Sequence, residues 1–156
     1  MDRVYRHYGS STFDISKFVP IRNRSEISCI ATKPYGGLWA SPIDSDADWY
    51  NWCLDNDFCI EELEKYFDFT LKDNSKIISI EKISDLNQIK GCYATTKNFY
   101  NHVTINFEAL VESGYDAIDF LINSETYWFM YGWDVDSLLV LNPDCIVLKE
   151  STCMTH

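Results

Sequence analysis

The chain has 156 residues, of which 46% are hydrophobic and 15% are aromatic. This composition excludes a disordered chain, and the length is sufficient for a hydrophobic core, so we expect one domain over residues 1–156. The formal net charge of −11 argues against nucleic acid or an anionic membrane as the main partner, because binding to phosphates requires clustered Lys and Arg side chains.

Neither membrane insertion nor metal binding is expected from the sequence. No apolar run approaches the roughly 18 residues that a membrane span needs, and the opening residues MDRVYR do not resemble a secretory leader. The six cysteines form no CxxC pair, and no histidine lies at ligand spacing from them. We therefore expect free thiols in a reducing compartment, no metal site and a cytoplasmic location.

The first expected element is a strand at residues 3–8, where residues for an inner and an outer face alternate. The turn residues HYGSS end this strand. His7 at the exit can point into a cleft while the backbone of Gly9 stays open to a ligand, although a histidine bonded within a sheet fits the same pattern. Residues 12–32 are expected to form a loop and a short strand.

The next elements place two aromatic residues on either side of a turn. The sequence GLWAS predicts a strand over residues 37–41, and an acidic, aromatic helix is expected over residues 45–55. Tyr50 in this helix follows Trp39 in the strand by eleven residues. The two rings can face each other across a slot that suits a flat, polar ring, and the same residues also fit an ordinary aromatic core.

The remaining pattern contains many short strands and few helices. Helices are expected over 57–67 and 105–113, a short turn or helix over 84–89, a loop over 91–102 and around 124–125, and strands over 76–81, 115–121, 127–133, 137–141 and 145–148. The strands do not alternate with helices in a βαβ order. The pattern therefore predicts an α+β fold with a mostly antiparallel or split sheet.

Four motifs of the chain occur in an order known from one family. They are HYG at residues 7–9, GLWAS at 37–41, the helix aromatic Tyr50, and GYDAI at 114–118 followed by Asp136 at the head of a late strand. Together these motifs resemble the ADP-ribosyltransferase fold, the NAD-binding family that includes diphtheria toxin and the poly(ADP-ribose) polymerases. The resemblance extends over nearly the whole chain.

This resemblance implies split antiparallel β-sheets with a few helices around a cleft that binds NAD as a substrate. It implies that the His7 side chain bonds a ribose hydroxyl, and that the backbone near Gly9 bonds the nicotinamide carboxamide. Trp39 and Tyr50 would enclose the nicotinamide ring, because stacking a cationic ring on aromatic faces is favourable by roughly 0.5–2 kcal/mol. Ser41 would support the same ring by hydrogen bonding.

The resemblance also implies a catalytic carboxylate. Asp136 holds the position of the family's acid, which stabilises positive charge as the nicotinamide–ribose bond breaks. The family normally has glutamate there, and Asp136 is one methylene shorter. Asp134, two residues earlier, can substitute for it, and Glu125 is a weaker candidate. The chain also departs from the family in carrying Trp39 where tyrosine is usual, and in placing Tyr8 between the histidine and the glycine.

The favoured function is that of an NAD-dependent ADP-ribosyltransferase, which transfers ADP-ribose to a protein or other acceptor, or to water. Two alternatives stay open. The same cleft can hold NAD or ADP-ribose without turnover, or the chain is an acidic interaction or inhibitor protein with no nucleotide site. An RNA 2′-phosphotransferase of the same fold is disfavoured by the acidity of the chain.

Overall fold

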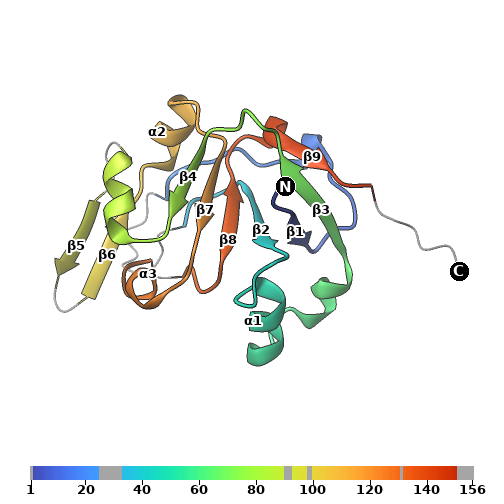
Figure 1. The fold of residues 1–156 in the computed structure, drawn as a ribbon, viewed down its shortest axis with the longest axis horizontal. Coiled ribbons are helices and arrows are strands. Elements are labelled where there is room, and N and C mark those ends of the chain that lie inside the picture. Colours follow the sequence, from blue (N-terminus) through green and yellow to red (C-terminus); the bar gives the residue numbers. More distant parts are fainter. Residues whose placement is uncertain (1, 25–32, 90–92, 98–99, 131, 151–156) are drawn as a thin grey trace, which may run out of the picture.

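The computed structural model describes residues 2–24, 33–89, 93–97, 100–130 and 132–150 (Figure 1). Seven strands form one sheet in the order β4-β7-β8-β2-β1-β3-β9, and a separate pair is formed by β5 and β6. Among the paired strands, β4 and β7 run parallel and the other neighbours run antiparallel. The strands are β1 (Tyr5–Tyr8), β2 (Leu38–Pro42), β3 (Tyr66–Leu71), β4 (Ile77–Ile80), β5 (Tyr93–Lys97), β6 (Tyr100–Thr104), β7 (Ala117–Phe120), β8 (Ser137–Val140) and β9 (Ile146–Leu148).

Short helices lie around the edges of the sheet, with α1 at the lower end of β1 and β2 in Figure 1. The α-helices are α1 (Trp49–Asn56), α2 (Phe107–Glu112) and α3 (Ser124–Phe129), and the 3-10 helices are η1 (Ile15–Lys17), η2 (Ile60–Glu64), η3 (Ile83–Gln88) and η4 (Pro143–Cys145). This arrangement confirms the predicted α+β class. The larger sheet is continuous, so the described strands do not form two fully separate halves.

Strand β2 is shared between two parts of this sheet. Its residues 38–40 pair with β8, whereas β1 pairs only with its last two residues, through Tyr5 with Pro42 and Arg6 with Ser41. Beyond Arg6, strand β1 continues along β3 and separates from β2. A space therefore opens between the end of β1 and the start of β2.

The hydrophobic core lies on both faces of the sheet. Leu139 of β8 belongs to one buried cluster, while Leu138 and Val140 belong to the other. This division follows from the pleat, because successive side chains of a strand point to opposite faces. All four residues of β8 are buried, so this strand is the rigid centre against which β2 and β7 are placed.

Three expectations from the sequence are wrong where the structure describes the chain. Residues 57–67 form only the short helix η2, and strand β3 begins at Tyr66, where buried Phe67 and Phe69 alternate with the more exposed Tyr66 and Asp68. Residues 124–129 form α3 instead of a loop and the start of a strand, since the Asn123 side chain accepts hydrogen bonds from the Glu125 and Thr126 amides and caps a helix. Strands β5 and β6 replace much of the loop expected over 91–102, part of which lies outside the described residues.

We expect Gly36→Ala to destabilise the protein by about 3 kcal/mol. Gly36 has a φ of 75°, and an added Cβ would clash with the backbone carbonyls of Val19 and Pro20, which have little freedom to move. Gly114→Ala is the matched control, because Gly114 has a φ of 82° and an added Cβ there meets nothing within 4 Å. Urea denaturation of both variants should show a much smaller loss for Gly114→Ala, and equal losses would contradict this account.

Candidate functional site

A cavity of about 270 Å³ opens where β1 and β2 separate, and the segment that leads into β8 closes its other side. Four of the site residues expected from the sequence line it, namely His7, Trp39, Ser41 and Asp134. The complete lining consists of Arg6, His7, Tyr8, Lys33, Trp39, Ala40, Ser41, Trp49, Gly132, Trp133, Asp134, Val135 and Ser137.

The His7 side chain crosses the gap between the two strands. Its Nδ1 lies 2.7 Å from the carbonyl oxygen of Trp39, and its ring packs against Phe67 with the centroids 5.1 Å apart. A carbonyl oxygen only accepts hydrogen bonds, so Nδ1 carries the proton in this contact. In the neutral ring, Nε2 is then left as an acceptor, which suits a hydroxyl donor from a ligand.

Trp39 is held in place by other aromatic residues. Its ring meets Trp133 edge to face, with centroids 4.7 Å apart and planes at 71°. Trp133 is only 1% exposed and also packs against Phe120 at 5.0 Å. Because edge-to-face packing fixes both position and tilt, Trp39 presents a rigid ring to the cavity.

The second aromatic wall comes from helix α1. Trp49, the first residue of that helix, lines the cavity and stacks on Trp52 at a centroid distance of 5.1 Å and an angle of 9°. The Ser41 hydroxyl accepts a hydrogen bond of 3.0 Å from the Trp49 amide. Ser41 therefore ties the end of β2 to the start of α1 and sets the position of this ring.

Two cations line the cavity, and they differ in their partners. Arg6 forms a two-pronged ion pair with Asp68 at 2.7 and 2.8 Å, and hydrogen bonding in this pair raises the pKa of Arg6. The Lys33 ammonium lies 5.2 Å from the ring centroid of Trp39. Burial lowers the pKa of Lys33, and the nearby charge of Asp134 partly opposes that effect. Arg6 is thus paired with Asp68, whereas the Lys33 amino group lies against an aromatic ring of the cavity.

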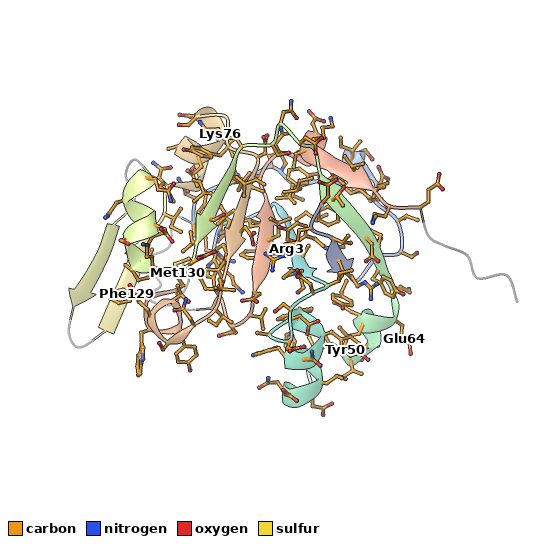
Figure 2. All side chains as sticks on the ribbon, in the orientation of Figure 1. Arg3, Tyr50, Glu64, Lys76, Phe129 and Met130 are labelled. Atoms are coloured by element: carbon orange, nitrogen blue, oxygen red, sulfur yellow. The ribbon has the colours of Figure 1, made fainter. Side chains whose placement is uncertain are left out.

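Gly9 and Tyr50, two other expected site residues, lie outside the lining. The Gly9 amide donates a 2.8 Å hydrogen bond to the Lys65 carbonyl, so this N–H is engaged within the protein. Tyr50 is 41% exposed on α1, with its ring 6.2 Å from that of Tyr8 (Figure 2). The helix aromatic at the cavity is therefore Trp49, one residue earlier.

Asp136 also lies outside the lining, and this residue is only 6% exposed. One oxygen accepts a 2.6 Å hydrogen bond from the Ser45 hydroxyl, and the other accepts a 2.8 Å bond from the Ile122 amide. Its own amide donates to the Ala47 carbonyl at 2.8 Å. Asp136 joins the loop before α1 to the turn after β7, whereas the exposed Asp134 is the carboxylate that lines the cavity.

Lys33, Trp49 and Trp133 are among the lining residues that reasoning from the sequence missed. The helix that contains Trp49 begins later than expected, because the Asp48 side chain caps it by accepting a hydrogen bond from the Asn51 amide. Placing the cap at Asp48 would have put Trp49 in the first turn, next to the strand. Lys33 and Trp133 carried no comparable local signal.

Within the described part of the chain, no helix has the length and apolar character to cross a bilayer, and no group of three or more His, Cys, Asp or Glu side chains is arranged to hold a metal ion. The three cysteines placed by the structure, Cys53, Cys59 and Cys145, are free thiols. Comparison of the chain with protein-family models, curated proteins and solved structures finds no match.

Proposed function

We propose that the cavity binds the nicotinamide end of NAD and that the protein is an NAD-dependent ADP-ribosyltransferase. One observation carries this proposal: His7, Trp39, Ser41 and Asp134, chosen from the sequence for these roles, line the same cavity. These residues come from two strands and the segment before a third, and they meet because β1 and β2 separate at this point.

The size and the walls of the cavity suit a flat cationic ring. A volume of about 270 Å³ is just below the roughly 300–1,000 Å³ of sites that hold whole drug-sized ligands, so the cavity suits one end of a dinucleotide. Trp39 and Trp49 supply aromatic faces, which attract a pyridinium ring. In its neutral form, the His7 ring offers Nε2 as an acceptor for a ribose hydroxyl.

Asp134 is the group that we assign to the chemical step. The bond between ribose C1′ and the nicotinamide nitrogen breaks, and its electron pair stays on the nitrogen, which neutralises the ring. Positive charge develops on the ribose, where a fixed carboxylate stabilises it. The acceptor atom then bonds to C1′ and releases its proton to solvent. Asp134 is the only carboxylate among the described lining residues.

A second candidate is a module that binds NAD without cleaving it. The observation in its favour is Asp136, whose carboxylate occupies the family's catalytic position in the sequence and makes structural hydrogen bonds to Ser45 and Ile122. Asp134 is exposed, so solvent screens its charge and weakens the stabilisation that it can give.

Incubation of the protein with NAD separates the two candidates. For the enzyme we expect free nicotinamide to accumulate in proportion to protein concentration, as measured by chromatography. Calorimetric binding without nicotinamide release after long incubation would support the binding module. If NAD neither binds nor reacts, both candidates are wrong, and the chain is better treated as an acidic interaction protein.

A further inference from the structure

The Lys33 ammonium lies where an aromatic cavity would receive a cationic ring. Its Nζ is 5.2 Å from the centroid of Trp39, and both residues line the cavity. Its aliphatic chain passes close to Gly132, where an added Cβ would lie 3.6 Å from Lys33 Cε. The side chain is therefore directed along the wall of the cavity, with the charge at the tryptophan ring.

The described residues compensate the charge of Lys33 only in part. No carboxylate oxygen of the described residues lies within 4.0 Å of its ammonium, although Asp134 lines the same cavity. Arg6, the other cation of the lining, is already held by Asp68. Among the described residues, Lys33 is thus the lining cation without a carboxylate partner, so it can pair with an anionic group of a ligand, and its flexible four-carbon chain allows the ammonium to move.

This placement has two opposite effects on a ligand. A cationic ring must displace the ammonium from Trp39, because two like charges cannot share one ring face without repulsion. An anionic group on the same ligand gains a partner, because lysine binds phosphate well as a point charge. A ligand that carries only the cationic ring must displace the ammonium from Trp39 and has no anionic group with which the ammonium can pair.

We propose that Lys33 makes the cavity selective for ligands that combine a cationic ring with a phosphate. On binding, the ring takes the place of the ammonium against Trp39, and the ammonium pairs with the phosphate. This inference rests on the proposed function, since NAD carries both groups, and it goes further by assigning the selectivity to one side chain.

Two probes test the exchange in the whole protein. N1-methylnicotinamide carries only the cationic ring, and nicotinamide mononucleotide carries the ring and a phosphate. Calorimetry with Lys33→Met, which keeps an unbranched side chain one atom shorter and removes the charge, should show nicotinamide mononucleotide binding about tenfold weaker and N1-methylnicotinamide binding severalfold tighter than in the unaltered protein. Lys33→Arg, which keeps the charge, should retain the preference for the mononucleotide.

The matched control is Lys76→Met. Lys76 Nζ lies 4.0 Å from the ring centroid of Tyr115, at the end of the sheet away from α1 (Figure 2), so this variant removes an equivalent charge outside the cavity. It should change neither affinity. If Lys33→Met shifts both probes in the same direction, or shifts neither, the inference is wrong while the proposed function stands. If neither probe binds the unaltered protein, the proposed function fails as well.

Discussion

Replacing Trp39 with alanine is expected to weaken NAD binding by about tenfold or more, because it removes the aromatic face on which the nicotinamide ring stacks. Isothermal titration calorimetry of the purified variant measures the loss. Trp128→Ala is the matched control, since Trp128 is 68% exposed on α3 and does not line the cavity. This control should bind NAD with the affinity of the unaltered protein.

A structural explanation for the loss can be separated from a direct one. Trp39 packs against Trp133, so Trp39→Ala also lowers the free energy of unfolding, and urea denaturation should confirm that the variant is still folded under the titration conditions. Trp39→Phe keeps an aromatic ring and should recover most of the affinity. Unchanged NAD binding in a folded Trp39→Ala protein would contradict the assignment of this ring.

The second large effect is expected when the two neighbouring carboxylates are removed one at a time. Asp134→Ala should lower the rate of nicotinamide release by about 100-fold or more, because the developing charge on the ribose loses its partner. Its thermal stability should be nearly unchanged, since the side chain is exposed and forms none of the salt bridges in the described part of the chain.

Asp136→Ala should show the reverse pattern. Removing this carboxylate leaves the Ile122 amide and the Ser45 hydroxyl without their acceptor, which we expect to cost about 3 kcal/mol of unfolding free energy. Nicotinamide release should fall only as far as the folded fraction falls. A stable Asp136→Ala protein that has lost nicotinamide release would show instead that the carboxylate named by the sequence motif is the catalytic one.

Most of the sheet could be predicted because its strands carry a strong local signal. LLVL at residues 138–141 is apolar without interruption, and Ser137–Val140 form β8, which is buried on both faces. The failures arose where local patterns were ambiguous. The aromatic run at residues 127–133 predicts a strand, whereas the capping side chain of Asn123 favours the helix α3. Asp57 as a cap and the helical spacing of Ile60, Leu63 and Phe67 predict a helix through about residue 67, but only the short 3-10 helix η2 forms.

The candidate site could be predicted only in part, for geometrical reasons. His7 and Trp39 lie on strands whose positions follow from the sequence pattern. The motifs that contain them therefore predict that the two residues lie close together, as the contact of His7 Nδ1 with the Trp39 carbonyl oxygen shows. The choice between Tyr50 and Trp49 depends on where α1 begins, and one residue changes the direction of a side chain by about 100°. Assigning the cavity carboxylate to Asp134 instead of Asp136 depends on the hydrogen bonds that Ser45 and Ile122 donate to Asp136. These two residues are distant from Asp136 in the sequence, so the sequence pattern does not show the bonds.

The central claim is that the nicotinamide end of NAD lies against Trp39. Proton NMR of NAD during titration with the protein tests this claim most directly, because aromatic rings shield protons that lie over their faces. We expect the nicotinamide proton signals to move upfield on binding, and this shift to be lost with Trp39→Ala and kept with Trp128→Ala. Nicotinamide signals that stay in place at saturating protein, or that shift equally with Trp39→Ala, would contradict the account.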